Sequence, residues 1–335
     1  MHTVAAGPLL AVDWIKFDPE ALGRNIVGLT IDGLTYGSIY ALIAIGYTLV
    51  YGVLRLINFA HSEVFLVGLF AQYFVLQAIG FSPSADAYDQ GIPLTVLYLS
   101  VALIAAMAAS GGTAVLLERV AYRPLRRRGA PPLVFLITAI GASLVISQTF
   151  FAWRGPNPEP QIRLVEPVPV FTPFGAEVSN VTLLIIISAL VLMIVADVFV
   201  NRTRFGMGIR SVAQDPATAR LMGVDPERVI MLTFLVGGIL AGAAALLYSI
   251  RIPQGIVYSG GFLLGIKAFS SAVLGGIGNV RGALLGGLIL GVAENWGQAL
   301  FGSGWRDVIA FVLLIAVLMI RPTGILGESL GRARV

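Results

Sequence analysis

The sequence contains no cysteine and only two histidines, His2 and His61. Without cysteine the chain can form neither a disulfide nor a thiolate metal site, and two histidines are too few for a histidine-rich metal centre. Charged residues are also scarce, at 12% of the chain, whereas a soluble domain carries about 25%. Hydrophobic residues make up 57%, and several apolar runs reach the roughly 20 residues that cross a bilayer. This composition predicts an all-α polytopic membrane protein.

Motifs for nucleotide binding and for catalysis are missing as well. The glycine-rich stretch GGIGNVRG, residues 275–282, lacks the lysine and the following hydroxyl residue of a phosphate-binding loop. The chain has no G-x-S-x-G motif and no paired histidine and aspartate that would indicate a catalytic cluster. We therefore expect no catalytic residue, no bound metal and no cofactor held by this chain.

Nine apolar segments are candidates for membrane-spanning helices, and the later ones are short or broken by glycine. They are about 26–53, 60–79, 93–117, 133–151, 181–200, 229–250, 262–277, 283–298 and 308–320. The seventh and eighth could instead form one re-entrant pair, so we expect a bundle of about eight or nine transmembrane helices. The chain then divides into an N-terminal surface segment (1–25), a transmembrane domain (26–321) and a tail (322–335).

Basic residues are distributed unequally between the two sides of this bundle. If the segments cross the membrane alternately, fifteen arginines fall on one side and six basic residues on the other. Basic residues accumulate in cytoplasmic loops, so the first side is cytoplasmic. This places the arginine-rich stretches 118–128 and 201–228 and the C-terminus in the cytoplasm. The Pro-rich loop 153–180 and the N-terminus lie outside. The same distribution explains the pI near 9.5 without any nucleic-acid partner.

The polar segment 201–228 contains two Asp-Pro pairs, at 215–216 and 225–226. Aspartate is a good N-cap and proline is favoured at the first helical position, so each pair predicts a helix start. The first helix would cover 216–222 and end at Gly223, and the second would continue into the next span. A helix of about two turns, roughly 10 Å long, is not stable alone in water. We expect it to lie against another protein.

A first polar group, Asn58, His61 and Glu63, interrupts the apolar sequence between the first two spans. One interpretation is a helix start, with Asn58 as N-cap and Glu63 favoured by the helix dipole. The other is a break inside the membrane near 46–52, where polar groups would face a transport pathway. The two interpretations are compatible.

A second segment, 271–295, shows a similar order: a Gly-rich apolar run, then Asn279, then another apolar run. Paired Gly-interrupted segments in the two halves of a transporter indicate pathway elements, although glycine packing between helices explains the pattern equally well. Lys267 and Glu294 are ionisable residues within predicted spans, where charges usually have a function. The predicted pathway residues are Asn58, His61, Glu63, Lys267, Asn279 and Glu294.

Several segments of the chain resemble the permease subunits of branched-chain amino acid ABC importers, the LivH-type family. They are YALIAIGYTLVYGVLRLINFAHSEVFLVG (40–68), ERVAYRPLR (118–126), RFGMGIRSVAQDPATARLMGVDPERVIMLTF (204–234), KAFSSAVLGGIGNVRGALLGGLILGVAE (267–294) and RPTGILG (321–327). Together they cover about half of the chain. His61-Ser62-Glu63 stands where many relatives have His-Gly-Glu, and the regions 81–88 and 154–179 match nothing in the family.

The resemblance implies a heteromeric importer of the bacterial inner membrane. This chain would pair with a second homologous permease, two cytoplasmic ATPase subunits and a periplasmic substrate-binding protein. It would form half of the pathway for leucine, isoleucine and valine without being an enzyme itself, because the partner subunits would use the ATP. The helix 216–222 would be the coupling helix that docks on an ATPase subunit. The predicted coupling residues are Arg210, Asp215, Pro216, Arg220, Leu221, Met222 and Gly223.

Two alternatives remain open at this point. Relatives with almost the same motifs carry urea or short-chain amides, and no charged pair is clearly placed to hold an amino acid's two charged groups. The Gly-broken spans would also suit a secondary transporter or channel acting alone, in which buried carboxylates such as Glu63, Asp197 or Glu294 would carry ions. The sequence does not identify the exact substrate, the residues that line the path or the partner chains.

Overall fold

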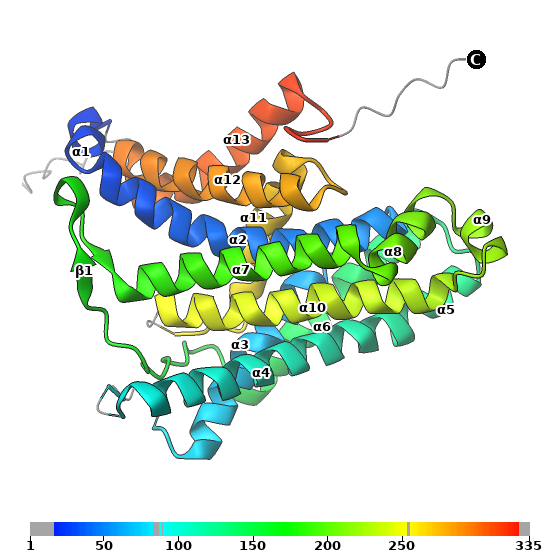
Figure 1. Cartoon of the computed structure of the whole chain (residues 1–335), viewed down its shortest axis with the longest axis horizontal. Coiled ribbons are helices and arrows are strands. Elements are labelled where there is room, and N and C mark those ends of the chain that lie inside the picture. The colour runs from blue at the N-terminus through cyan, green and yellow to red at the C-terminus, as the bar shows by residue number, and fades with distance from the viewer. Residues whose placement is uncertain (1–16, 83–86, 89, 253–254, 328–335) are drawn as a thin grey trace, which may run out of the picture.

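The computed structural model describes residues 17–82, 87–88, 90–252 and 255–327, and Figure 1 shows their arrangement. The first sixteen residues of the predicted surface segment and residues 328–335 of the predicted tail lie outside this range. The α-helices are α1 (Pro19–Arg24), α2 (Ile26–Leu54), α3 (His61–Ile79), α4 (Ile92–Leu117), α5 (Arg123–Arg127), α6 (Pro132–Arg154), α7 (Asn180–Arg202), α8 (Arg204–Gln214), α9 (Pro216–Leu221), α10 (Pro226–Arg251), α11 (Gly260–Gly275), α12 (Val280–Phe301) and α13 (Arg306–Ile320). Short elements are a π-helical turn, η1 (Glu118–Tyr122), two 3₁₀ turns, η2 (Pro173–Gly175) and η3 (Ser303–Trp305), and two strands, β1 (Pro169–Phe171) and β2 (Val178–Ser179).

Among the described residues, 7 helices are long and apolar enough to cross a membrane. They are α2, α3, α4 with its continuation, α6, α7, α10 and the helix that ends in α13. α11 and α12 together form one further pair, bent by 119° at a short break. The chain is therefore an all-α polytopic membrane protein, as predicted. The bend gives the region 262–298 the broken or re-entrant geometry that the sequence left open.

The helices differ in how much of their surface the bundle covers. α2 and α10 are largely buried, whereas α4, α6, α7 and α13 expose most of their surface. The exposed side chains of these outer helices are apolar, as Ile104, Leu144, Ile194 and Val312 illustrate. Apolar side chains on an outer face suit contact with lipid hydrocarbon, so α2 and α10 form the centre of the bundle and the other four form its rim.

Glycine allows a close helix contact between α2 and α12. A Cβ atom at Gly287 would lie 2.6 Å from the Cβ of Ala41, and one at Gly291 would lie 2.3 Å from the Gly33 carbonyl oxygen. Small residues at a helix interface let two backbones approach closely in a membrane. Glycine packing, the simpler explanation for part of the segment 271–295, therefore accounts for the glycines of α12.

The two ends of the bundle have different character. α5, α8 and α9 lie at one end, and the hairpin of β1 and β2 lies at the other, as Figure 1 shows. The arginine-rich stretch 118–128, expected between two spans, is helical as far as Arg127, because α4 continues through η1 into α5. The buried carboxylate of Glu118 explains this, since it accepts hydrogen bonds from Arg123 and Arg126, each at 3.0 Å, across consecutive turns. These ion pairs keep the arginines on a helix rather than in a loop.

Candidate functional site

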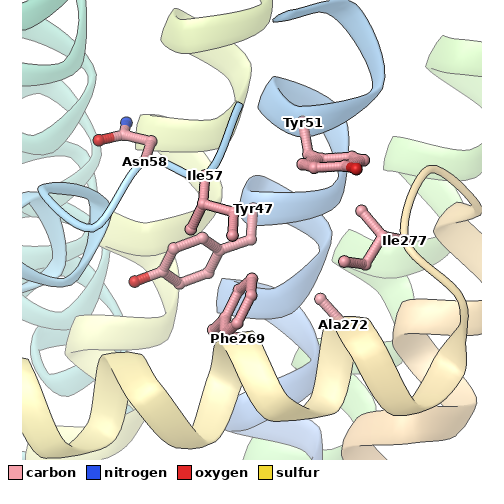
Figure 2. Close-up of a pocket in the computed structure, with 7 residues that line it drawn as sticks. All are labelled: Tyr47, Tyr51, Ile57, Asn58, Phe269, Ala272 and Ile277. Carbon is pink, nitrogen blue, oxygen red and sulfur yellow. The ribbon is translucent and has the colours of Figure 1, made fainter. Parts of the chain in front are cut away.

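A small pocket lies among α2, the segment 55–60 and the turn that joins α11 to α12 (Figure 2). Its lining residues are Tyr47, Tyr51, Ile57, Asn58, Phe269, Ala272 and Ile277. The space they enclose is small in this structure and has room for about one water molecule. The wall is mostly apolar and aromatic. The pocket also joins the two glycine-interrupted segments that the sequence singled out, because each contributes residues to it.

The first of these segments is a break within the bundle. α2 ends with Arg55 in the left-handed conformation, φ 53°, and α3 begins six residues later at His61. A Cβ at Gly46 would lie 2.3 Å from His61 Nε2, so α3 starts at the level of Gly46. Gly46 lies eight residues before the end of α2, which corresponds to roughly 12 Å of helix. The start of α3 therefore lies about two helical turns back from the end of α2, the position that the second interpretation of the polar group expects.

Asn58 is not the N-cap of α3, so that prediction is wrong. The N-cap is Ala60, which makes no side-chain capping hydrogen bond. The side-chain Oδ1 of Asn58 instead accepts a hydrogen bond from the hydroxyl of Tyr122 at 2.6 Å, and in Figure 2 the side-chain amide points away from Tyr47. Asn58 thus ties the pocket wall to the π-helical turn.

One face of α11 connects the pocket to the start of α3. A Cβ at Gly265 would lie 2.2 Å from the Cβ of Ser62 and 3.1 Å from the Tyr47 hydroxyl. One turn further, the Phe269 ring packs edge-on against Tyr47, with 5.9 Å between ring centroids. One turn before Gly265, a Cβ at Gly261 would lie 3.0 Å from Glu63 Oε2. Residues 261, 265, 269 and 272 thus form a continuous stripe that faces α2 and α3.

His61 and Glu63 are both buried, at the two sides of Ser62. The His61 ring packs edge-on against Tyr47, with 4.8 Å between centroids. Glu63 Oε1 accepts a hydrogen bond from Ser143 Oγ of α6 at 3.1 Å. α3, α6 and α11 therefore meet at the Glu63 carboxylate, close to the pocket but not in its lining.

Lys267 and Glu294 form an ion pair with each other, so neither has a free charge. Lys267 Nζ lies 3.2 Å from Glu294 Oε1 and 2.5 Å from Asp307 Oδ1. The other carboxylate oxygen of Glu294 accepts hydrogen bonds from Arg306 at 3.1 Å and from the Tyr40 hydroxyl at 3.0 Å. This charged cluster joins α2, α11, α12 and α13. Tyr40, Arg306 and Asp307 were not predicted as site residues, because nothing in their local sequence indicates a partner so distant along the chain.

Asn279 acts as the N-cap of α12 rather than as a pocket residue. Its side-chain oxygen accepts hydrogen bonds from the backbone N–H groups of Arg281 at 3.0 Å and Gly282 at 3.2 Å. Its amide nitrogen donates to the Leu326 carbonyl at 3.0 Å. Asn279 therefore holds the turn between α11 and α12 against the C-terminal segment. Its position next to the pocket residue Ile277 makes this an indirect support of the pocket wall.

The helix α9 begins and ends where the Asp-Pro pattern predicted. The Asp215 side chain accepts a hydrogen bond from the N–H of Ala217 at 2.9 Å, and Gly223 has a φ of 84° just after the helix. Hydrogen bonds from the Thr218 hydroxyl and the Ala217 N–H lower the pKa of Asp215, which keeps the capping carboxylate ionised. α10 begins in the same way, with Asp225 accepting from the N–H of Glu227 at 3.0 Å.

α9 presents apolar side chains to solvent at the end of the bundle. Leu221 is 87% exposed and Met222 is 79% exposed. Arg220 is also exposed, whereas the Arg210 guanidinium donates a hydrogen bond to the Val200 carbonyl at the end of α7. Large exposed apolar residues beside charged ones are typical of a protein-binding surface. Of the predicted coupling residues, Leu221, Met222 and Arg220 are free to contact a partner, while Arg210, also exposed, holds α8 to the end of α7.

α8 was not predicted, although it carries α9. Thr203 caps it by accepting a hydrogen bond from the N–H of Gly206 at 3.1 Å. Its buried side is formed by Gly206, Gly208, Ile209 and Val212. Two of these four residues are glycines, which disfavour a helix in isolation. The Thr203 cap and the helical spacing of the apolar positions are local features that could have revealed it.

Comparison with known proteins shows the family of the chain. Residues 29–318 match the family described as branched-chain amino acid transport system / permease component. The chain is 41% identical over 302 residues to the high-affinity branched-chain amino acid transport system permease protein BraD of Pseudomonas aeruginosa, covering 89% of this chain and 94% of BraD. It is 37% identical over 304 residues to the corresponding protein LivH of Escherichia coli, covering 89% and 94% of the two chains.

A more distant relative is the probable branched-chain amino acid transport permease protein LivH of Methanocaldococcus jannaschii. It is 27% identical over 329 residues, covering 93% of this chain and 96% of the relative. No solved structure matches the chain. The family match covers most of the chain, and two of these relatives exceed 30% identity over nearly the whole length. The chain therefore belongs to the family of branched-chain amino acid transport system permeases.

Proposed function

We propose that this chain is the permease subunit of an ATP-binding-cassette importer and forms half of the pathway for leucine, isoleucine and valine. The chain is similar over nearly its whole length to BraD and LivH, permease proteins of high-affinity branched-chain amino acid transport systems. The structural observation that carries the proposal is the pocket, because both glycine-broken segments line it. Gly-broken segments at the centre of a transporter are where substrates pass.

The pocket wall favours an aliphatic substrate over urea or a short amide. Tyr47, Phe269, Ile57, Ala272 and Ile277 present rings and methyl groups to the enclosed space. Apolar surface gains free energy by leaving water, so a branched aliphatic side chain fits such a wall. Urea has no apolar part that would benefit from it.

The transport function requires partner proteins. The sequence has no phosphate-binding loop, so ATP hydrolysis belongs to two partner ATPase subunits, and this chain is a transport subunit rather than an enzyme. We propose that α9 docks on one ATPase through the exposed Leu221 and Met222. A second homologous permease would complete the pathway, and a periplasmic binding protein would deliver the substrate.

The unequal arginine distribution supports an inner-membrane protein whose C-terminus and α9 face the cytoplasm and whose N-terminus faces outward.

The two proposals of cargo and partners are tested together by uptake measurements. Cells that carry the complete importer, and matched cells in which this chain alone is deleted, are given labelled leucine or labelled urea.

We expect leucine uptake that depends on this chain, competes with isoleucine and valine, and stops when ATP is depleted. Uptake of urea in place of leucine would reject the proposed cargo. Uptake that tolerates ATP depletion but collapses with an ionophore would reject the importer and favour a secondary transporter. Transport by the purified chain alone, without an ATPase or second permease, would reject the partner proposal.

A further inference from the structure

Glu63 is a buried carboxylate without a cationic partner. Its residue is 1% exposed, and it lies in the first turn of α3. Oε1 accepts a hydrogen bond from Ser143 Oγ at 3.1 Å and lies 3.5 Å from Ser62 Oγ. Oε2 is buried and has no hydrogen-bond partner. No basic nitrogen of the described residues lies within the 4.0 Å of an ion pair with Glu63.

The other buried glutamates of the bundle are neutralised. Glu118 pairs with Arg123 and Arg126, and Glu294 pairs with Lys267 and Arg306. A buried charge without a partner is costly, because the protein interior replaces water poorly. Within the described part of the chain, the bundle therefore supplies two cations to each of the other two buried glutamates and none to Glu63. Among the described residues, Glu63 is therefore the buried glutamate whose carboxylate is left to accept a cation from another molecule.

The position of Glu63 connects it to the pocket. Along the stripe of α11, Gly261 faces Glu63 Oε2, Gly265 faces Ser62 and the Tyr47 hydroxyl, and Phe269 faces the Tyr47 ring. Ala272 then lines the pocket itself. Residues 261 and 272 are eleven positions apart, which corresponds to roughly 16 Å of helix. One helix face thus leads from an unpaired carboxylate, past two hydroxyl groups, to an apolar and aromatic pocket.

We propose that Glu63 binds the ammonium group of the amino acid as it passes between α3 and α11. This inference rests on the proposed function and extends it by naming the residue that recognises the charged end of the cargo. A primary ammonium has three donors and no acceptor, and the groups around Glu63 Oε2 supply acceptors. Ser62 Oγ donates to the Phe59 carbonyl at 2.7 Å, so its lone pairs stay available to a cation. The apolar side chain of the same amino acid would follow in the pocket.

The glycines of α11 explain how such a site could open and close. In this structure Gly261 covers Glu63 Oε2, and a Cβ there would also lie 2.9 Å from the Ser62 carbonyl oxygen. The contact between α3 and α11 is therefore made by backbone rather than by interlocking side chains at 261 and 265. A shift of α11 exposes the carboxylate without moving any side chain out of the way. Access to Glu63 would then depend on the position of the bent pair of α11 and α12.

The first test measures leucine uptake by the complete importer in proteoliposomes, with the variants Glu63→Gln and Glu63→Asp. Glutamine keeps the size of the side chain but loses the charge, whereas aspartate keeps the charge. We expect E63Q to lower uptake at least about tenfold and E63D to lower it less, because a charged hydrogen bond is lost only in the first. As matched control, Asp197→Asn removes a carboxylate that pairs with Arg281 on the far side of α12, and should keep uptake within about twofold.

The second test measures binding directly and does not require turnover. Labelled leucine is bound to the purified complex of permeases and ATPases, without the periplasmic binding protein, and unlabelled compounds are added to compete with it. We expect leucine and 3-methylbutylamine to compete, 4-methylpentanoate to have no effect, and the E63Q complex to bind no leucine.

The outcomes separate the two proposals. If the unmodified importer does not carry leucine, the proposed function fails. If it carries leucine and E63Q equals the unmodified protein, or E63D is no better than E63Q, the role of Glu63 is wrong. Equal competition by 4-methylpentanoate and 3-methylbutylamine, or leucine binding that persists in E63Q, also overturns it. A complex with unmodified Glu63 that binds no leucine would overturn it as well.

Discussion

The Nζ atom of Lys267 on α11 lies 3.2 Å from Oε1 of Glu294 on α12, and both side chains are buried. The two helices form the bent pair, so this ion pair links them at a point away from the turn at 276–279. Two residues at the start of α13 complete the cluster: Arg306 pairs with Glu294, and Asp307 pairs with Lys267. The buried cluster thereby sets the angle of α11, the helix that carries the stripe towards the pocket.

Removing one charge of this cluster should destabilise the bundle. Glu294→Leu leaves Lys267 with Asp307 alone and Arg306 without a partner, and breaking a buried pair from one side costs about 3–5 kcal/mol. The double variant Lys267→Met, Glu294→Leu should recover part of this loss, because it restores the balance of charge by leaving Arg306 and Asp307. Thermal unfolding of the purified complex measures both. A double variant less stable than the sum of the singles would show that the pair contributes something other than mutual neutralisation.

The coupling prediction concerns the exposed residues of α9. Replacing Leu221 and Met222 with serine should leave the bundle intact, because both side chains lie in solvent, yet uncouple ATP hydrolysis from leucine uptake. The matched control is Leu116→Ser, an exposed apolar residue on the outer face of α4. We expect the double variant to lose most ATP-driven uptake at normal expression, and the control to keep it. Equal uptake in both would remove α9 as the docking element.

The start of α9 gives a second, independent version of that prediction. Replacing Asp215-Pro216 with two glycines removes the cap and the preformed first turn, so the short helix should unfold while the spans remain. Uptake and coupled ATP hydrolysis should be abolished although the protein is still inserted at normal levels. Unchanged uptake in this variant would show that transport does not pass through the helix.

The cap of α9 should also depend on pH. The hydrogen bonds of Thr218 and Ala217 hold the pKa of Asp215 below its usual value. A lowered pKa in the folded state contributes stability above the unfolded pKa, and this is lost as the pH falls through the folded pKa. Amide exchange at Ala217, after correction for intrinsic rates, should therefore become less protected at acidic pH. Asp215→Asn is the control, and its protection should not change over the same range.

The contact between α2 and α12 predicts a strong difference between two glycines. Gly287→Ala would place a Cβ 2.6 Å from that of Ala41, whereas Gly112→Ala on α4 meets no atom within 4 Å. Alanine favours a helix at both positions, so only the clash differs. We expect G287A to lose about 1–3 kcal/mol of stability and G112A to lose none, measured by thermal unfolding of the complex. Similar melting of the two variants would contradict the close helix contact.

Features that depend on neighbouring residues could be predicted from the sequence. The caps at Asp215 and Asp225, the stop at Gly223 and most span boundaries follow from backbone hydrogen bonds within a few residues. The membrane class follows from apolar length alone, because only helices or closed barrels satisfy the backbone in a bilayer. α8 was missed because Gly206 and Gly208 disfavour a helix, although its apolar periodicity and the Thr203 cap indicated one. The stretch 118–128 is helical as far as Arg127 because Glu118 pairs with Arg123 and Arg126.

The candidate site depended on contacts that cross the sequence. Asn58 could cap a helix or bind Tyr122, and only the packing of α3 against η1 decided for the second. Lys267 and Glu294 were two separate intramembrane charges in the sequence and became one neutralised cluster when α13 supplied Arg306 and Asp307. Glu63 differs from this pair, because in the described part of the folded chain no cation lies beside its carboxylate. Helix formation is local, whereas the neutralisation of a buried charge depends on which helices meet, and that is a property of the tertiary structure.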